Sequence, residues 1–200
     1  MLKIVFLIII FLPSSALASG AYPYRIPEKT VIGFLQKHYI KKNETMLDIA
    51  RKYDLGYQEL MLLYPKMDPW LPPAGKTIEI PTKWVLPQYN TKGIVINVAE
   101  LRLFFYLPQI GLVKTYPVGI GIKDSPTPFG NFKVIEKEKN PTWDIPLSLQ
   151  EKYGKTKIPP GPQNPLGNFW IGLSTNGYGI HGTNSPWGIG RLVSHGCIRL

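Results

Sequence analysis

Cysteine is nearly absent from this sequence, because Cys197 is the only one among 200 residues. One cysteine cannot form an internal disulfide, which excludes a small scaffold held together by disulfides. The thiol is therefore an accident, an intermolecular partner or a reactive group. The residues around Cys197 are needed to distinguish these three possibilities.

Long apolar runs are missing as well. The run from Ile4 to Leu12 has nine residues, whereas a helix that spans a bilayer needs about 20. Lys3 precedes this run and Ala16-Leu17-Ala18 follows it, which is the pattern of a secretory signal peptide with an A-x-A cleavage site. We therefore expect residues 1–18 to be a cleavable signal peptide, and the exported protein to have no transmembrane anchor.

Acidic side chains are few, with 13 Asp and Glu against 23 Lys and Arg. Removing Lys3 with the signal peptide leaves 22 basic and 13 acidic side chains, a net charge of +9. This charge favours anionic surroundings such as wall polymers or lipid phosphates, although a soluble protein with a basic surface fits equally well. No run rich in Arg and Lys is interleaved with aromatic residues, so nucleic acid is not an expected partner.

Residues 38–82 predict a small unit of the order β-α-α-β. Thr45 can cap a helix, with Asp48 at the capping-box position and apolar residues at helical spacing after it. Gly56 breaks that helix, and a proline-rich loop separates a second helix from the last strand. In order, the expected elements are a strand at 38–40, a helix after Thr45, a helix at 58–63 and a strand at 77–80.

This order, the Asn43-Glu44-Thr45 turn and the ending "LPPAGKTIEIP" resemble a LysM domain. The resemblance implies that residues 38–82 bind the glycan of peptidoglycan or related N-acetylglucosamine polymers. The alternative is that their aromatic and aliphatic side chains only form a small core.

After the linker "TKWVLPQYNTKG" the pattern changes to strands, in a catalytic-domain region that we place at residues 91–200. Apolar and polar positions alternate, with a hairpin turn expected at Ala99 and Glu100. Residues 140–170 are rich in proline and have little periodicity, so we expect a long surface loop there. The expected strand segments are "GIVINVAELRLFFYL", "LVKTYPVGIGI", "GNFKVIEKE" and "FWIGLSTNGYGIHGT".

Two of the three histidines, His181 and His195, lie within sixteen residues of Cys197. A free thiol with a pKa near 8.5 is mostly protonated at neutral pH, so a cysteine nucleophile needs an imidazole within hydrogen-bond reach. If residues 195–197 form a strand, the His195 and Cys197 side chains share a face but lie about 6 to 7 Å apart, too far for direct proton transfer. His181 arrives from another strand and can be closer.

Gly196 can adopt backbone angles closed to other residues, which would turn the chain sharply and expose main-chain N–H groups to a developing oxyanion. The Arg199 guanidinium suits a carboxylate, or a surface ion pair. Two other interpretations stay open. His181, His195 and Cys197 could ligate zinc, although no carboxylate lies nearby to support the ligands, or these side chains are inert core residues.

The segment "YGIHGTNSPWGIGRLVSHGCIRL" resembles the signature of the L,D-transpeptidase (YkuD-type) catalytic domain, and "PTPFGNFKV" and "NPTWDIP" upstream agree with it. The resemblance covers residues 91–200. It implies a mainly β, sandwich-like fold and acyl transfer on the tetrapeptide stems of peptidoglycan, with no metal or organic cofactor. Family members continue past this motif with a helix and a strand, so the resemblance also implies a catalytic domain that is incomplete at its C-terminus.

In such enzymes Cys197 would be the nucleophile that attacks the carbonyl between the L-centre of diaminopimelate and the terminal D-alanine. His181 would be the general base that takes the thiol proton and passes it to the leaving D-alanine. The resemblance places His195 and Gly196 at the oxyanion site, Ser194 as an orienting residue, and Arg199 near the carboxylates of the substrate.

The group that accepts the stem decides the product. A neighbouring stem amine gives a 3-3 crosslink, a lysine of an outer-membrane lipoprotein gives a wall anchor, and water gives a carboxypeptidase.

A LysM-like unit ahead of this catalytic domain is the arrangement of periplasmic members from Gram-negative bacteria, so we expect the protein to be located in the periplasm. The alternative function is a truncated, catalytically defunct peptidoglycan-binding protein. A papain-like peptidase fits poorly, because its cysteine precedes its histidine in the chain.

Overall fold

The computed structural model describes residues 20–25, 30–87 and 92–200, and the predicted signal peptide at 1–18 lies outside them. Within this part the chain is mainly β, as the sequence predicts. No helix among the described residues is long and apolar enough to cross a membrane. The first elements are β1 (Ala21–Pro23), β2 (Val31–Gly33), β3 (Gln36–Tyr39), α1 (Met46–Lys52), α2 (Tyr57–Leu63), β4 (Thr77–Ile80), β5 (Lys83–Val85), β6 (Gly93–Asn97), β7 (Arg102–Leu107) and β8 (Leu112–Pro117). They are followed by β9 (Ile120–Gly121), β10 (Val134–Lys139), β11 (Trp143–Asp144), α3 (Leu147–Tyr153), β12 (Lys157–Ile158), β13 (Phe169–Leu173), β14 (Gly179–His181), β15 (Leu192–Ser194) and β16 (Ile198–Arg199), with 3-10 turns η1 (Pro108–Ile110) and η2 (Pro186–Gly188).

The β-α-α-β order predicted for residues 38–82 is confirmed by β3, α1, α2 and β4, which we call the N-terminal module. Strands β3 and β4 pair antiparallel. The Thr45 hydroxyl accepts a hydrogen bond from the Asp48 N–H at 3.1 Å, and the Asp48 carboxylate accepts one from the Thr45 N–H at 3.0 Å. This capping box starts α1 where the sequence predicts it. Gly56 follows the end of α1 and stands at the N-cap of α2.

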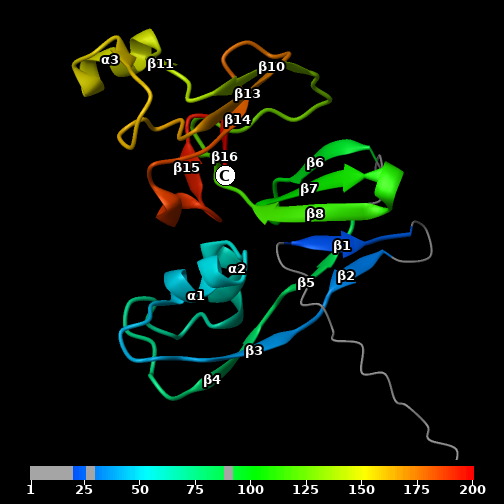
Figure 1. Cartoon of the computed structure of the whole chain (residues 1–200). Coiled ribbons are helices and arrows are strands. Elements are labelled where there is room, and N and C mark those ends of the chain that lie inside the picture. The colour runs from blue at the N-terminus through cyan, green and yellow to red at the C-terminus, as the bar shows by residue number, and fades with distance from the viewer. Residues whose placement is uncertain (1–19, 26–29, 88–91) are drawn as a thin grey trace, which may run out of the picture.

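The first large sheet has the strand order β1-β8-β7-β6. The β6–β7 hairpin turns at Ala99 and Glu100 as predicted, because the Asn97 side-chain oxygen accepts from both of their N–H groups. Strand β1 comes from the start of the described chain and pairs antiparallel with β8. Figure 1 shows the blue β1 lying along the green β8.

The prediction of a linker after residue 81 was wrong in its first part. Residues 83–85 form strand β5, which pairs antiparallel with β2, and Trp84 and Leu86 are buried. The Arg102 guanidinium lies 4.3 Å from the centre of the Trp84 ring. Trp84 is therefore covered partly by residues distant in the sequence, which the local pattern does not show. Residues 88–91 of the predicted linker lie outside the described residues.

One hydrophobic core joins the N-terminal module to the first sheet. Ile49 and Leu60 from the two helices pack in the same cluster as Phe104 and Val113 from β7 and β8. The helices therefore lie directly on this part of the protein, and Figure 1 shows α1 and α2 in cyan beneath the red C-terminal strands. A second, smaller core contains Leu101, Leu103, Val118, Ile120, Ile180 and Ile198.

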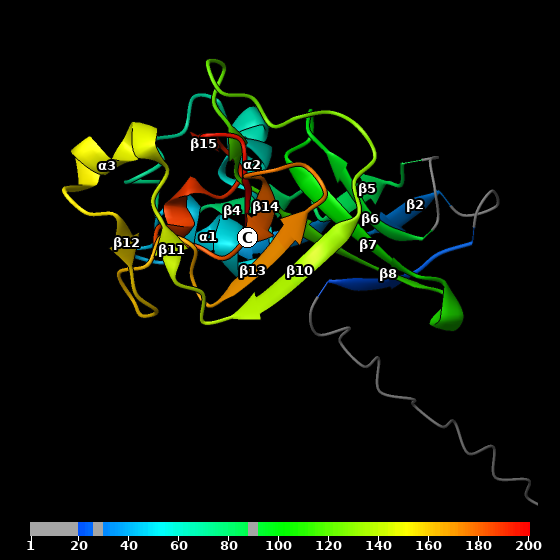
Figure 2. The ribbon, with the colours of Figure 1, turned by 90° about the horizontal axis from the view of Figure 1, so that it is seen from above.

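The second large sheet has the order β10-β13-β14-β16, antiparallel except for the parallel pair β14 and β16. Figure 2 shows β13 between β10 and β14. The segment 140–168 lies beside this sheet, and no residue of α3 is buried, as a surface segment predicts, although Ile145 and Asn164 are buried. The expectation of an irregular loop was wrong, because the segment contains α3 and the antiparallel pair β11–β12. These elements are two to seven residues long, too short to produce a readable period in the sequence.

Candidate active site

Residues 195–197 form a turn between β15 and β16. The premise that they form a strand was therefore wrong. Gly196 has φ of +113°, a conformation that residues with a side chain rarely adopt. A Cβ atom at this position would also lie 2.5 Å from Cε1 of Tyr178. The sharp turn predicted at Gly196 is confirmed, and Tyr178 packs against it.

The Ser194 side chain closes this turn from inside. Its hydroxyl donates to the Cys197 carbonyl oxygen at 2.6 Å and accepts from the Gly196 N–H at 3.1 Å. Ser194 is only 2% exposed, so water does not compete for either bond. The Gly196 N–H is thus engaged by Ser194 and does not face an open site.

The loop at residues 123–130 holds the turn from the other side. The Thr127 hydroxyl donates to the Gly196 carbonyl oxygen at 2.8 Å and accepts from the Gly121 N–H at 2.9 Å. The Ser125 hydroxyl donates to the His195 carbonyl oxygen at 3.1 Å. Sequence reasoning gave neither residue a role. The "PTPFG" motif, which contains Thr127, could have pointed to this loop, because the motif already supported the family resemblance.

The Cys197 sulfur lies against the start of β14. Its Sγ makes a weak hydrogen bond of 3.6 Å to the Gly177 carbonyl oxygen, and it accepts from the Gly179 N–H. Strand β14 ends at His181, two residues later, and pairs in parallel with β16, with His181 opposite Arg199. The junction of β14 and β16 therefore carries His181 and Arg199 on paired strands, and the Cys197 sulfur lies at the start of the same β14 strand.

The His181 ring is held in one orientation. Its Nδ1 lies 2.6 Å from the Gly182 carbonyl oxygen, and the ring stacks on Trp170 with centroids 5.9 Å apart. A carbonyl oxygen can only accept, so Nδ1 carries the proton and Nε2 keeps its lone pair. The imidazole is thus in the tautomer that can take a proton at Nε2. Trp170 is a further residue that sequence reasoning missed.

Burial keeps both central groups uncharged near neutral pH. Burial lowers the pKa of His181 to about 4. The nearby Arg199 cation also lowers this pKa, whereas the hydrogen bond to Gly182 acts to raise it. Burial also raises the pKa of the Cys197 thiol, although the Gly179 N–H and Arg199 act in the opposite direction. A neutral thiol and a neutral imidazole are suited to proton transfer during nucleophilic attack, rather than to a preformed ion pair.

Arg199 places a positive charge beside the thiol. Burial lowers the pKa of its guanidinium, and the neighbouring Tyr153 and Cys197 act to raise it. Its Nε is buried and has no hydrogen-bond partner among the described residues. This cation can stabilise negative charge that develops on the sulfur, or a carboxylate that comes close to it.

His195 contributes its main chain to the turn, while its side chain is exposed. The zinc alternative would need this ring to converge with His181 and Cys197. In the described ranges, no group of three or more His, Cys, Asp or Glu side chains is placed to hold a metal ion. The arrangement therefore gives the zinc interpretation no support.

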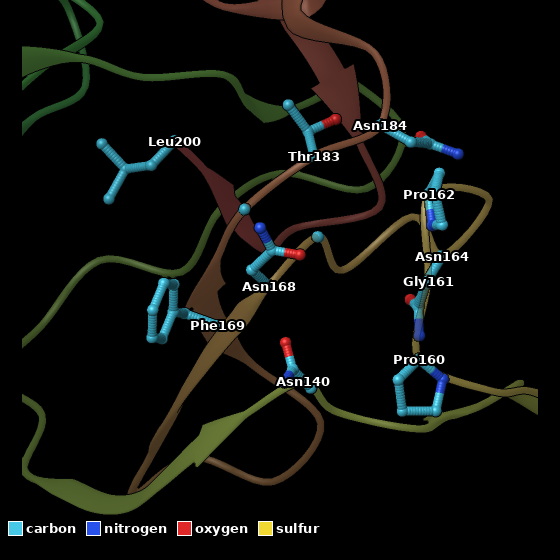
Figure 3. Close-up of a pocket in the computed structure, with 12 residues that line it drawn as sticks. Asn140, Pro160, Gly161, Pro162, Asn164, Asn168, Phe169, Thr183, Asn184 and Leu200 are labelled. Carbon is cyan, nitrogen blue, oxygen red and sulfur yellow. The ribbon is translucent and has the colours of Figure 1, made fainter.

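A surface pocket of about 690 Å³ lies next to this junction, on the side of Gly182 and Leu200. Figure 3 shows the Asn140 and Asn168 amides within it, with Phe169 and Leu200 on one side and residues 160–162 on the other. Its lining mixes amide and hydroxyl side chains with apolar ones and includes no charged side chain. Cys197 is not part of the lining, so the pocket adjoins the histidine end of the site rather than the sulfur.

The family model and the curated relatives show which family this chain belongs to. A family model described as the L,D-transpeptidase catalytic domain matches residues 91–200. The probable L,D-transpeptidase YcfS of Escherichia coli K12 is 38% identical over 198 residues, 92% of this chain and 62% of that protein. The putative L,D-transpeptidase YkuD of Bacillus licheniformis is 32% identical over 166 residues, 82% of this chain and 85% of that protein. The crystal structure of L,D-transpeptidase 3 from Mycobacterium tuberculosis aligns with 91% of this chain and 84% of that one, at 15% identity and a TM-score of 0.42. This chain thus spans about three fifths of the length of the E. coli relative.

Proposed function

Because this chain belongs to the L,D-transpeptidase catalytic-domain family, we propose that it transfers peptidoglycan tetrapeptide stems through an acyl-enzyme on Cys197. The observation that carries the proposal is the position of the Cys197 sulfur. It lies at the start of β14, and the same strand ends in an imidazole whose Nε2 has a free lone pair.

The first half-reaction forms a thioester. Cys197 Sγ attacks the carbonyl carbon that joins diaminopimelate to the terminal D-alanine, while His181 Nε2 takes the thiol proton. The amide C–N bond then breaks as Nε2 returns this proton to the leaving amine. D-Alanine departs, and the stem stays bound to the sulfur.

The second half-reaction releases the stem to an acceptor. An amine attacks the thioester carbonyl, His181 Nε2 takes its proton, and the C–S bond breaks. The sulfur leaves with the bonding electrons and recovers the proton from Nε2. The acceptor is a stem amine for a 3-3 crosslink or a lipoprotein lysine for a wall anchor. Water as acceptor gives a carboxypeptidase.

The turn at 195–197 supplies the charge stabilisation in this proposal. Each half-reaction places a negative charge on the carbonyl oxygen, and main-chain N–H groups stabilise such an oxyanion by about 3 kcal/mol per donor. Ser194 engages the Gly196 N–H, so we assign the donors to the main chain of His195 and Cys197. Gly196 then serves through its φ, and Arg199 attracts the carboxylates of the stem.

We assign glycan binding to the N-terminal module, as the LysM-like order of its elements suggests. Trp70 and Leu71 are 62% and 79% exposed, on a loop that Asp68 fixes by accepting from both of their N–H groups. Exposed aromatic and apolar side chains on a fixed loop suit the apolar faces of sugar rings. With the signal-peptide pattern at residues 1–18, this assignment places the protein in the periplasm.

The enzymatic proposal is tested with a tetrapeptide muropeptide and the exported part of the chain. Mass spectrometry should show D-alanine release and an acyl adduct on Cys197 in the wild type. Cys197→Ala should abolish both, and His181→Gln should reduce release by at least about 100-fold. Equal release by the wild type and Cys197→Ala would refute the proposal.

Glycan binding is tested by sedimentation with peptidoglycan sacculi. Binding should survive Cys197→Ala and weaken in Trp70→Ala. Phe129→Ala is the matched control, because Phe129 is an aromatic side chain that is 82% exposed and lies outside the N-terminal module. If the two variants sediment alike, the module does not bind glycan through this loop.

A further inference from the structure

The segment that leads into β15 is enclosed between the N-terminal module and the catalytic part of the chain. We call residues 189–191 the docking segment. On one side, the Tyr57 N–H at the start of α2 donates to the Ile189 carbonyl oxygen at 3.3 Å. On the other side, the Gly190 N–H donates to the Val118 carbonyl oxygen at 3.1 Å. Figure 1 shows α2 directly beneath the red chain that carries β15.

The two sides meet by backbone contact. A Cβ atom on Gly56 would lie 2.7 Å from the Gly190 Cα, and one on Gly190 would lie 2.4 Å from the Gly56 Cα. The φ of Gly56 is −75°, which any residue can adopt, so only this close approach requires a glycine there. Beside it, the Arg191 guanidinium lies 3.7 Å from the centre of the Tyr57 ring. This distance is well within the range of a cation–π contact.

Glu59 fixes the start of α2 on the first sheet. Its Oε2 accepts from the Gly56 N–H and from Arg102 Nη2, both at 2.7 Å, and its Oε1 accepts from Arg102 Nε at 2.9 Å. Arg102 is fully buried in β7. Two parallel bonds between a guanidinium and a carboxylate restrict both groups in orientation as well as distance. The first turn of α2 therefore has a set position against the docking segment.

The docking segment continues without a break into the site. Residues 192–194 form β15, and the Ser194 hydroxyl then closes the turn onto the Cys197 carbonyl oxygen. We propose that Gly56, Tyr57 and Glu59 of the N-terminal module are positioning residues for Cys197. They touch neither the sulfur nor the imidazole and act through the docking segment. The module is thus a structural part of the catalytic site, in addition to any part it has in glycan binding.

The test uses Gly56→Ala in the exported chain, because the added methyl group pushes the docking segment away without straining φ. Ile78→Ala is the matched control, since Ile78 is buried in the same module on β4, away from the docking segment. Both variants are measured well below their unfolding midpoints. The readouts are kcat and KM for D-alanine release, and the rate of Cys197 alkylation by iodoacetamide at pH 7. Alkylation reports on one site, because Cys197 is the only thiol.

Gly56→Ala should lower kcat by about tenfold with little change in KM, because displaced reacting groups lose their alignment. Alkylation of Cys197 should become faster, because a loosened turn exposes more of the half-buried thiol. Ile78→Ala should lower the unfolding midpoint at least as much, yet change both rates less than about twofold. Equal rates in the two variants would overturn the proposal.

Tyr57→Leu covers the case in which Gly56→Ala does not fold. It removes the ring under Arg191 and keeps the main-chain bond to Ile189. It should change both rates in the same directions, by about threefold, and wild-type rates in this variant would also overturn the proposal. The kcat readout rests on the proposed function, whereas the alkylation readout does not. If even the wild type releases no D-alanine, the proposed function fails while alkylation still decides the positioning role.

Discussion

The Ser194 hydroxyl donates a 2.6 Å hydrogen bond to the carbonyl oxygen of Cys197, so a residue at the end of β15 holds the residue that precedes β16. The Ser194 hydroxyl oxygen also accepts a hydrogen bond from the Gly196 N–H at 3.1 Å. The shape of the turn that carries the nucleophile therefore depends on one buried hydroxyl.

Ser194→Ala should lower kcat for D-alanine release by about 10- to 100-fold, because the turn loses the bond that aligns the sulfur. The free energy of unfolding should fall by about 1–3 kcal/mol, because the buried Gly196 N–H loses its partner. Steady-state kinetics and urea unfolding measure the two effects. Ser148→Ala on the exposed helix α3 is the control and should change neither. Full activity in Ser194→Ala would show that the turn holds its shape without the hydroxyl.

The pH dependence of Cys197 alkylation should show a thiol that ionises late. Burial raises its pKa and lowers that of His181 to about 4, so no thiolate–imidazolium pair forms near neutral pH. Alkylation by iodoacetamide should be slow at pH 7 and rise through the alkaline range. His181→Gln should leave this profile nearly unchanged, because it removes an uncharged ring. A plateau of fast alkylation beginning near pH 5 would contradict the neutral pair.

The stability of the protein should depend on pH through His181. Between pH 6.5 and about 4 the unfolded chain binds a proton at this position and the folded chain does not. The unfolded state therefore binds more protons over this window, and the free energy of unfolding falls as the pH falls through it. The contribution of this group is up to about 3 kcal/mol and is fully present above pH 6.5. Urea unfolding of the wild type and His181→Gln at pH 7, 5.5 and 4.5 isolates it, and identical pH slopes would contradict the burial of the ring.

Two ion pairs of the same length should differ greatly in their effect on stability. The nitrogen–oxygen distance is 2.7 Å in both the Arg102–Glu59 and the Lys157–Asp144 pair. The Arg102 side chain is fully buried, whereas both side chains of the Lys157–Asp144 pair are about two-thirds exposed. Glu59→Gln should lower the free energy of unfolding by about 3–5 kcal/mol, because the Arg102 charge stays buried without a counter-charge. Lys157→Gln should change it by less than about 1 kcal/mol. Chemical denaturation compares them, and similar losses would show that burial does not control the strength of these pairs.

Features that depend on neighbouring residues could be predicted from the amino-acid order. The Thr45–Asp48 capping box and the turn at Ala99 and Glu100 join groups a few positions apart, so their residue types suffice. The sharp turn at Gly196 could be predicted because glycine, here between His195 and Cys197, adopts backbone angles that are closed to other residues. The chemistry around Cys197 could also be predicted, because the only thiol of the sequence lies within sixteen residues of two histidines.

Features that depend on contacts between distant residues could not be predicted in this way. Thr127 reaches Gly196 across 69 positions, and Glu59 reaches Arg102 across 43. Neither pair leaves a periodic or local signal, because its members meet only after the strands and helices have packed. The same holds for Trp84, which reads as part of a linker until the Arg102 side chain covers its ring. The chain order thus specified the reactive groups and the short elements that carry them, whereas packing between those elements set the position, burial and ionisation of each group.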